Sequence, residues 1–507
     1  MAALARSFPS TLQVSVPRNR RRVRSANVLA ARLAFGAGLI AFAFALQFST
    51  ASLGSVDGYF HIRYSALLRA AGWRGFPPEF PWLPLTILAP DRYYDHHLLF
   101  HAWLSLFAGR DLILGAKLAS ACGAAAAFLA AYGFLLLWRI RRAEWWMIAL
   151  LAGAAGFPYR MEMPRVQAWS LVFLIAALHL LLRRRDAWLF PLAWLYTWTY
   201  DAFPLLLALC ACSVVARALL ERTIAWRPVA WAVAGIVGGL IVNPYFPADL
   251  RYIAHHYLAK IQMSEAVRVG SEWYPLPVAE WLGWSGLLAL LAAVGVAAYR
   301  YRAGLTTERL TTLLAAAFFF CLLWRAVRFV EYFVPFAAFA LAFTLHERID
   351  ALVARLSERG RRVLAGLLLA WLAGTTVVAI VQLRGRPPAS RYGAAARWID
   401  EHVEPGSMVF LTDWSDFPLL FFHAPNYRYV IGLDPTYLAE RDPALYEQWR
   451  RIVEGREPNS AALIDTAFGA RIALTNTASG EFLATIDREG RAQRVYEDAD
   501  CILYRIR

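Results

Sequence analysis

The residues best suited to chemistry follow directly after the first long apolar segment of the chain. Asp57 begins the sequence Asp57-Gly-Tyr-Phe-His61-Ile-Arg63. A carboxylate close to a membrane boundary and beside an aromatic pair could accept a proton or hold a metal ion. Asp is also a favoured N-cap residue, so Asp57 could instead begin a helix. Both interpretations stay open at the level of sequence.

A histidine cluster lies further along, in Asp91-Arg-Tyr-Tyr-Asp95-His96-His97 and His101. Its three histidines fall within six residues of a chain that has ten. Imidazole is a common metal ligand, and His97 and His101 are one helical turn apart if the segment is helical. The cluster could hold a metal, contact a substrate phosphate, or simply lie at a membrane interface.

Charged residues recur in the later loops. Tyr159-Arg160-Met-Glu162-Met-Pro-Arg165-Val-Gln167 places two arginines and a glutamate between two apolar segments. The further candidates are Tyr200, Asp201, Asn243, Glu272, Trp273, Arg325, Arg328 and Glu331. Any one of them could merely pair with lipid phosphates. Arginine grips phosphate through paired donors, so their recurrence on one side of the membrane favours an anionic substrate.

The composition indicates the kind of protein that must position these residues. The 507 residues are 59% hydrophobic and 18% charged, with a mean hydropathy of +0.42. Ordinary soluble domains are closer to half apolar and a quarter charged. This excludes a disordered chain, a collagen-like fibre and a disulfide scaffold, and it favours a polytopic membrane protein. The five cysteines show no pairing framework, so we expect no structural disulfide.

The net charge of +15 comes almost wholly from arginine, which punctuates the apolar segments as membrane topology requires. Nucleic acid is therefore not an expected partner. About eleven spans are predicted, with the N-terminus cytoplasmic and the arginine clusters all on the cytoplasmic side. The apolar runs are 28–48, 112–138, 144–158, 168–182, 187–199, 203–220, 229–243, 281–299, 310–324, 329–345 and 363–383. Within 187–220, one hairpin and one long helix fit equally well.

The chain divides into three parts in this interpretation. Residues 1–26 form a basic cytoplasmic tail, and residues 27–385 form the membrane domain with a long first outer loop at 49–110. Tandem prolines in Arg384-Gly-Arg-Pro-Pro stop the last helix. Residues 391–507 are then a small extracytoplasmic α/β domain. Its expected elements are strands at 408–412, 427–431 and 502–506 and a helix at 438–454.

In order along the chain, these motifs resemble the GT-C membrane glycosyltransferases. Asp57-Gly-Tyr-Phe-His-Ile-Arg is similar to the first acidic motif of the oligosaccharyltransferase catalytic subunit, and Trp324-Arg325-Ala-Val-Arg328-Phe to its late arginine segment. Asp413-Trp414-Ser415-Asp416-Phe417 is placed like the acceptor-reading WWDxG motif, but Ser415 intervenes and Pro418 replaces Gly. The second acidic pair of that family is reduced to Glu162.

Other segments look more like bacterial relatives that move single sugars from polyprenyl phosphate. They are Arg160…Pro164-Arg165-Val-Gln167, Asn243-Pro-Tyr245 and Glu272-Trp273-Tyr-Pro275. The resemblance implies a mainly α polytopic bundle in a bacterial inner membrane. It also implies inverting transfer of a sugar or oligosaccharide from a polyprenyl-(pyro)phosphate donor to a protein or glycolipid acceptor on the outer face.

The residues and the resemblance together assign roles. Asp57 would be the catalytic carboxylate that takes the acceptor's proton, with Glu162 as its partner in one cavity, where the pair could also hold Mg²⁺ or Mn²⁺. The donor phosphate would be bound by Arg325, Arg328, Arg160 and Arg165. The substrate contacts would be His61, Asp95, His96, His97, Glu272, Trp414 and Asp416.

Two other classes of protein would share part of this pattern. A transporter or flippase for a lipid-linked saccharide would also carry outer-face arginines, but no two-fold repeat of the kind common in transporters is visible. An envelope-assembly scaffold with a degenerate site is the other alternative. Loss of turnover on replacing Asp57 would separate an enzyme from both.

Overall fold

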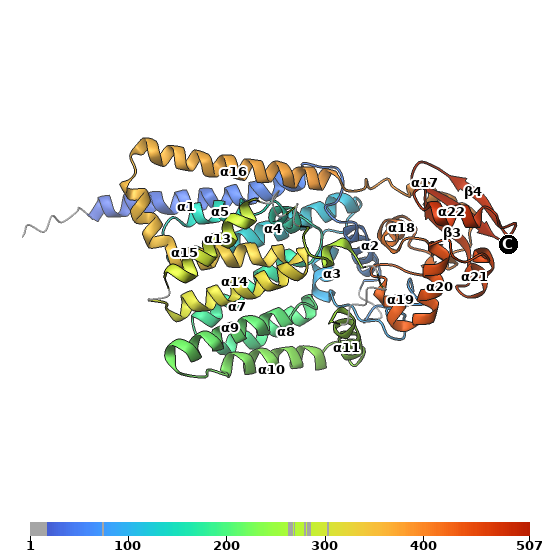
Figure 1. The fold of residues 1–507 in the computed structure, drawn as a ribbon, viewed down its shortest axis with the longest axis horizontal. Helices are drawn as coiled ribbons and strands as arrows, with labels where there is room; N and C mark the ends of the chain where they lie inside the picture. Colours follow the sequence, from blue (N-terminus) through green and yellow to red (C-terminus); the bar gives the residue numbers. More distant parts are fainter. Residues whose placement is uncertain are drawn as a thin grey trace, which may run out of the picture.

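The computed structural model describes residues 18–72, 76–261, 267, 269–277, 280, 285–301 and 304–507. Figure 1 shows a long bundle of helices at one end and a smaller domain with a sheet at the other. The expected fold class, a helical bundle followed by a small C-terminal α/β domain, is confirmed in these main features. Residues 1–17 of the predicted basic tail and residues 281–284 of one predicted span lie outside the described residues, as do the side chains of residues 18–25.

Within the described ranges, six helices are long and apolar enough to cross a membrane. They are α1 (Arg18–Gln47), α4 (Leu112–Leu137), α9 (Pro204–Glu221), α14 (Thr307–Arg325), α15 (Val330–Arg355) and α16 (Glu358–Arg384). Three helices with shorter apolar stretches accompany them, namely α7 (Gln167–Leu182), α10 (Arg227–Ile241) and α13 (Ser285–Arg300). The membrane bundle is thus supported, but the count of eleven spans is not confirmed.

The expected span at 144–158 is not one helix. It is split into α5 (Ala143–Leu151) and α6 (Gly156–Met161), and nine helical residues rise only about 14 Å. The break lies where two other helices press on the backbone. A Cβ on Gly153 would come within 2.9 Å of Val334 in α15, and one on Gly286 of α13 would come within 2.6 Å of the Gly153 carbonyl oxygen.

The ambiguous segment 187–220 is a hairpin. A short 3-10 turn, η1 (Asp186–Trp188), leads into α8 (Leu189–Thr199), and α9 begins at Pro204 after a tight turn. Proline suits a first helical turn because its missing N–H has no intrahelical partner there. The hairpin brings Tyr200 to the end of the bundle that faces the C-terminal domain.

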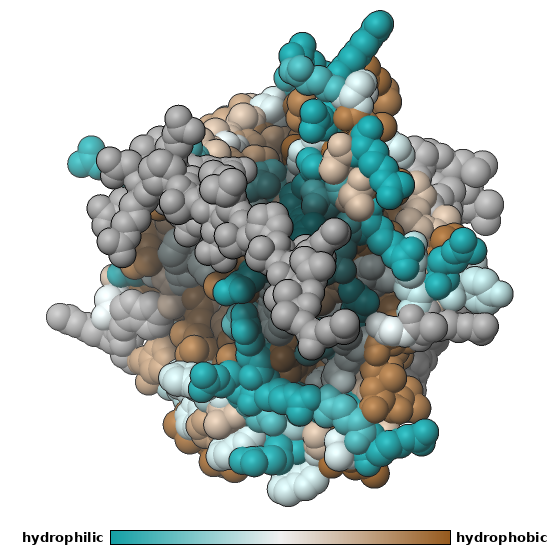
Figure 2. Space-filling view, turned by 90° about the vertical axis from the view of Figure 1, so that its left-hand side faces the viewer, coloured by the Kyte–Doolittle hydropathy of each residue, from teal (hydrophilic) through white to brown (hydrophobic). Residues whose placement is uncertain are grey.

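The opposite end of the bundle gathers arginines that come from distant loops. Arg141 and Arg142, before α5, each donate to Asp350 of α15 at 2.9 Å. Arg184, after α7, pairs with Glu221 at the end of α9. Figure 2 looks onto this end and shows hydrophilic side chains running across it between apolar ones. Two of the predicted arginine clusters, those around Arg141 and Arg184, therefore lie at the same end of the bundle.

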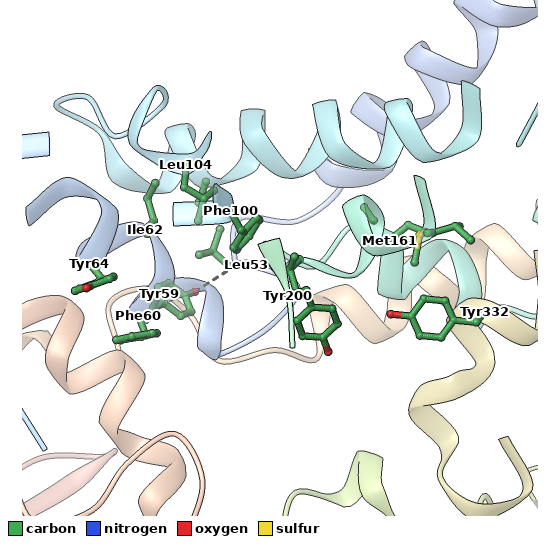
Figure 3. Close-up of a cluster of buried hydrophobic side chains, with 14 of the residues drawn as sticks. Leu53, Tyr59, Phe60, Ile62, Tyr64, Phe100, Leu104, Met161, Tyr200 and Tyr332 are labelled. Atoms are coloured by element: carbon green, nitrogen blue, oxygen red, sulfur yellow. Dashed lines mark hydrogen bonds between the residues drawn. The ribbon is translucent and has the colours of Figure 1, made fainter. Parts of the chain in front are cut away.

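The described residues of the predicted first outer loop, 49–110, are folded and join the two parts of the molecule. They contain α2 (Asp57–Ala70) and α3 (Leu98–Ser105), whose aromatic side chains lie close together (Figure 3). Tyr59 donates to the carbonyl of Pro387 in the linker at 3.2 Å and accepts from the amide of Leu53. Arg63 donates to the carbonyl of Phe422 in the C-terminal domain at 2.6 Å. Helix α2 therefore ties the bundle to the domain.

A second set of elements frames the space between bundle and domain: α11 (Ala248–Ile261), η2 (Ser271–Trp273) and η3 (Val327–Phe329). The C-terminal domain has a five-stranded sheet in the order β2-β1-β3-β5-β4. Strands β1 (Met408–Leu411), β2 (Arg428–Tyr429) and β3 (Ala470–Asn476) are parallel. Strands β5 (Cys501–Ile506) and β4 (Ala492–Glu497) complete it in antiparallel pairing.

The helices of this domain are short and follow the strands. They are α17 (Gly393–His402), η4 (Trp414–Asp416), α18 (Phe417–His423), α19 (Thr436–Arg441), α20 (Pro443–Val453), α21 (Ser460–Thr466) and α22 (Gly480–Ile486). The single helix expected at 438–454 is wrong. Asp442 accepts from the amide of Leu445 at 2.9 Å and Pro443 follows it, so a new helix starts there. Strands β3 and β4 were not predicted.

The fold predicts the topology of the chain. Helix α1 begins at the end of the bundle away from the C-terminal domain (Figure 1), so we expect the start of α1 and the C-terminal domain to lie on opposite sides of a membrane. The arginine-rich end is expected to be cytoplasmic. A reporter active only outside the cytoplasm is expected to be active when fused after Arg507 and silent when fused after Arg222. Activity at Arg222, or silence at Arg507, would contradict this orientation.

Candidate active site

A cavity of about 1010 Å³ lies between the helical bundle and the C-terminal domain. Its walls come from the start of α2, from α6 and the loop after it, from the α8–α9 turn, and from η2, η3 and the C-terminal domain. It therefore assembles residues that are up to several hundred positions apart in sequence. Its charged and aromatic lining includes Asp57, Tyr200, Glu272, Arg328 and Trp414.

Glu272 is the centre of the charge network in this cavity. Arg165 donates to it at 3.0 Å and Arg160 at 3.1 Å, and an Arg328 nitrogen lies 3.5 Å from its other carboxylate oxygen. Burial alone would raise the pKa of the Glu272 carboxyl, but Arg165, Arg328 and Arg160 together hold it well below its usual range. Glu272 is thus a carboxylate anion bound by three arginines.

Each of these arginines has at least one further partner. Arg165 also pairs with Asp57, and Arg160 donates to Glu331 of α15 at 2.8 Å. Three arginines and three carboxylates therefore meet in one network. Because buried charges are costly unless paired, the network keeps all six side chains in defined positions.

Arg328 is fixed on three sides. It donates to the hydroxyl of Tyr200 at 2.9 Å, and its guanidinium carbon lies 4.1 Å from the centre of the Trp273 ring. It also approaches Glu272, as described above. A planar fork held in this way presents its remaining N–H donors in a set direction.

Gly58 allows the Arg165 loop to reach Asp57. A Cβ at Gly58 would lie 2.0 Å from the Cγ of Pro164, so any other residue would push the loop away from the start of α2. The contact between Asp57 and Arg165 therefore depends on glycine at position 58, which allows the two segments to approach closely. The residue types around Gly58 give no sign of this role, because Pro164 is distant in sequence.

The histidine cluster is built around Asp95. His101 donates its Nδ1 proton to Asp95 at 2.8 Å, and its Nε2 lies 2.9 Å from Nδ1 of His61. The backbone amide of His97 donates to the same carboxylate at 2.9 Å. His61, His96 and His97 line the cavity, whereas Asp95 and His101 lie behind them. Burial, first of all, lowers the pKa of His61 and of His97 well below the usual value.

Most of the predicted site residues converge on this cavity. Those that line it are Asp57, His61, His96, His97, Arg160, Arg165, Glu272, Arg328 and Trp414. Four predicted residues are not among the lining residues, namely Asp95, Glu162, Arg325 and Asp416. Asp95 still reaches the cavity indirectly, through His101 and His61.

Glu162 does not share the cavity with Asp57, contrary to expectation. Its side chain is fully buried beside α1, where the Gln47 amide, oriented to donate, lies 2.9 Å from its carboxyl oxygen. Burial raises the pKa of Glu162 well above its usual range. The reason is the turn after α6, which directs Arg160 and Arg165 toward the cavity and the residue between them toward the bundle.

The residues suggested for Mg²⁺ or Mn²⁺ do not fit a cation site. Asp57 is already paired with Arg165, and Glu162 lies elsewhere. In the part of the chain that the structure describes, no three His, Cys, Asp or Glu side chains are grouped to hold a metal. The carboxylates that do accompany Asp57 in the network are Glu272 and Glu331.

Arg325 and Asp416 also lie away from the cavity. Arg325 is exposed at the end of α14, because the turn of η3 sends only Arg328 inward. Asp416 is buried within the C-terminal domain, where the Tyr392 hydroxyl donates to it at 2.6 Å. Burial, with the nearby Asp413, raises the pKa of Asp416 to about 7. Trp414 is the residue of this motif that reaches the cavity.

Solved structures share this architecture, although the sequence matches no family model and no curated protein. The archaeal oligosaccharyltransferase AglB from Archaeoglobus fulgidus, in complex with an inhibitory peptide and a dolichol-phosphate, has a TM-score of 0.63 at 16% identity. That match covers 88% of this chain and 69% of AglB. A complex of the Archaeoglobus oligosaccharyltransferase with Zn and sulfate gives a TM-score of 0.61 at 14% identity, over 93% of this chain and 73% of that one.

ArnT from Cupriavidus metallidurans, bound to undecaprenyl phosphate, has a TM-score of 0.58 at 15% identity. The match covers 93% of this chain and 97% of ArnT. Identities this low show the fold alone. The resemblance to GT-C glycosyltransferases is confirmed at that level, and the chain has the fold of these membrane enzymes.

The structure distinguishes Arg328, which lines the cavity, from Arg325, which does not. We expect Arg328→Lys to weaken binding of an inorganic pyrophosphate probe about tenfold or more, because one ammonium cannot keep the contacts to Tyr200, Trp273 and Glu272 while presenting paired donors. Arg325→Lys is the matched control and should bind as the wild type does. Equal affinities in all three proteins would show that Arg328 does not contact the phosphate.

The buried Asp416 predicts a pH effect on stability. Its raised pKa means that, between about pH 4 and pH 7, the folded protein holds a proton that the unfolded chain has lost. The free energy of unfolding that Asp416 contributes therefore falls as pH rises through this window. The thermal midpoint of the full-length protein in detergent should fall, relative to Asp416→Asn, between about pH 4 and pH 7, and the difference should level off above that window. Asp465→Asn, a change at a partly exposed carboxyl, is the control. Its thermal midpoint should change with pH in the same way as that of the wild type.

Proposed function

We propose that this protein is a membrane glycosyltransferase that uses a polyprenyl-(pyro)phosphate-linked sugar or oligosaccharide as donor. The acceptor would be a protein or a glycolipid on the outer face of a bacterial inner membrane. One observation carries the proposal: Asp57 and three arginines converge in a large cavity where a GT-C-type bundle meets its C-terminal domain.

The arginines support a phosphate-bearing donor. Arg160, Arg165 and Arg328 all contact Glu272, so this one carboxylate is the shared anionic partner of three cations. A donor phosphate could share or replace that carboxylate as their partner, since arginine binds both anions through paired donors. The dolichol-phosphate of the AglB complex and the undecaprenyl phosphate of the ArnT complex support a lipid phosphate as the ligand class.

The transfer itself needs little chemical assistance from the protein. A phosphate is a good leaving group once its charge is neutralised, so positioning and electrostatic stabilisation carry most of the rate. Asp57 would accept a hydrogen bond from the acceptor hydroxyl or amino group and orient it toward the anomeric carbon. Attack from the side opposite the phosphate inverts that carbon.

The shape of the cavity supports a saccharide as the transferred group. It has aromatic walls, with Trp273, Tyr274 and Trp414 on the side of the C-terminal domain and η2. Flat aromatic faces beside charged groups suit a ligand that has both apolar and hydroxyl-bearing surfaces. A volume of about 1010 Å³ is sufficient for a sugar phosphate and part of an acceptor.

Replacement of Asp57 tests the proposal. The donor is first identified by mass spectrometry of lipid that co-purifies with the wild-type protein, and turnover is then measured with that lipid. We expect Asp57→Asn to lower turnover at least about 100-fold, because the amide no longer offers a carboxylate to orient the acceptor. Binding of undecaprenyl phosphate should change far less, because the arginines remain.

Asp91→Asn is the matched control, since Asp91 lies in the same outer loop but is exposed and outside the cavity. It should keep wild-type turnover. A transporter or an assembly scaffold would show lipid binding without turnover in the wild type. Near-normal turnover in Asp57→Asn would instead remove Asp57 from the active site.

A further inference from the structure

A buried chain of hydrogen bonds leads from Asp95 to the cavity. Asp95 is 2% exposed and accepts from Nδ1 of His101 at 2.8 Å and at 2.9 Å through its two oxygens. His101 is 1% exposed, and its Nε2 lies 2.9 Å from Nδ1 of His61. His61 is the member of this chain that lines the cavity.

The direction of these hydrogen bonds follows from the carboxylate at the far end. Asp95 accepts only, so His101 must carry its proton on Nδ1, and a neutral His101 then offers the lone pair of Nε2. His61 must therefore donate from Nδ1 to His101. The Nε2 of His61 is left without a proton, and no described residue donates to it. The chain thus fixes one tautomer of His61, with a basic nitrogen toward the cavity.

The surroundings of His61 keep the ring neutral. Burial is the largest cause that lowers its pKa, and His101, Arg165 and His96 lower it further. His97 packs against the same ring, with ring centres 5.2 Å apart, and burial lowers the pKa of His97 as well. At neutral pH the ring is therefore an uncharged imidazole with a set tautomer, and the lone pair of its Nε2 is available to a group bound beside it.

Asp57 and His61 lie one turn apart on α2, and both line the cavity. One oxygen of Asp57 is already occupied by Arg165. The two side chains therefore suit different tasks. The arginine-bound carboxylate can orient an acceptor group by its remaining oxygen, while the unprotonated Nε2 of His61 can remove the proton from that group.

We propose that His61 is the proton acceptor of the transfer reaction and that His101 and Asp95 are its positioning residues. This rests on the proposed function. The acceptor oxygen or nitrogen forms a bond to the anomeric carbon, whose bond to the phosphate oxygen breaks, and the lipid phosphate leaves with that electron pair. The acceptor proton goes to Nε2 of His61, and the resulting imidazolium keeps its Nδ1–H hydrogen bond to His101, which Asp95 holds in place.

The first test removes the base and tries to replace it. His61→Ala should lower turnover about 100-fold or more, and added imidazole should restore part of it by entering the space left by the ring. The affinity for undecaprenyl phosphate should stay within about twofold of the wild type, because His61 is outside the arginine network. His402→Ala, at an exposed histidine of α17, is the control. Its turnover should equal that of the wild type with and without imidazole.

The second test concerns the relay, that is, the chain of hydrogen bonds from Asp95 through His101 to His61. Asp95→Asn keeps the shape but offers an amide donor to His101, which permits the opposite tautomer along the chain. Turnover should fall about 10-fold to 100-fold, with unchanged affinity for undecaprenyl phosphate. In protein labelled with ¹⁵N-histidine, the wild type should show His61 protonated at Nδ1 only, assigned by comparison with His61→Ala. In Asp95→Asn that signal should move toward the Nε2-protonated form.

Failure of this inference differs from failure of the proposed function. If Asp57→Asn is inactive while His61→Ala keeps more than about a third of wild-type turnover, the transferase assignment stands and His61 is a structural histidine. Loss of activity without imidazole rescue, together with an Nε2-protonated His61 in the wild type, would also overturn the proton-acceptor role. A wild type that binds lipid but transfers nothing would overturn the proposed function itself.

Discussion

The pairing of three arginines with three carboxylates between bundle and domain is the constraint on which the rest of the site depends. Arg160 is buried and Arg165 and Arg328 are partly buried, so each would be costly to place there without a counter-charge. Asp57, Glu272 and Glu331 supply those counter-charges from three separate parts of the chain. The network therefore determines how closely α2, the α6–α7 loop, η2, η3 and α15 approach.

Helix α2 links the arginine network to the C-terminal domain. Its first residue, Asp57, enters the arginine network, and its next turn presents His61 to the same cavity. The opposite side of the helix contacts the C-terminal domain through Arg63, whose guanidinium also lies 4.9 Å from the Phe422 ring centre. A shift of the C-terminal domain would therefore also move Asp57 and His61, the two side chains of α2 named above that line the cavity.

The likeness to AglB and ArnT concerns architecture, so the side chains at the cavity have to be considered in this chain alone. Trp414 reaches the cavity, but the aspartate two positions later is enclosed within its own domain by Tyr392. An acceptor-reading surface built on that aspartate is therefore absent among the described residues. The inserted Ser415 and the start of α18 at Phe417 explain this, since they turn Asp416 away from the bundle.

The sequence by itself determined the polytopic helical class, the C-terminal α/β domain and most of the residues that meet in the cavity. Apolar runs and arginine clusters report directly on burial in lipid, and charged residues at helix ends stand out against them. Only the tertiary structure decided which of those residues face one another. Glu162 and Asp57 looked equivalent in sequence, as did Arg325 and Arg328, because spacing along the chain does not reveal the direction of a short turn.

The same limit applies to the histidines and to Gly58. Their order in sequence indicated a cluster, but the relay from Asp95 through His101 to His61 joins α2 to α3 across forty positions. Gly58 mattered only because Pro164 comes to lie against it. Such contacts arise from packing between distant segments, which local patterns of residue type do not encode, whereas the length and polarity of each segment are encoded locally.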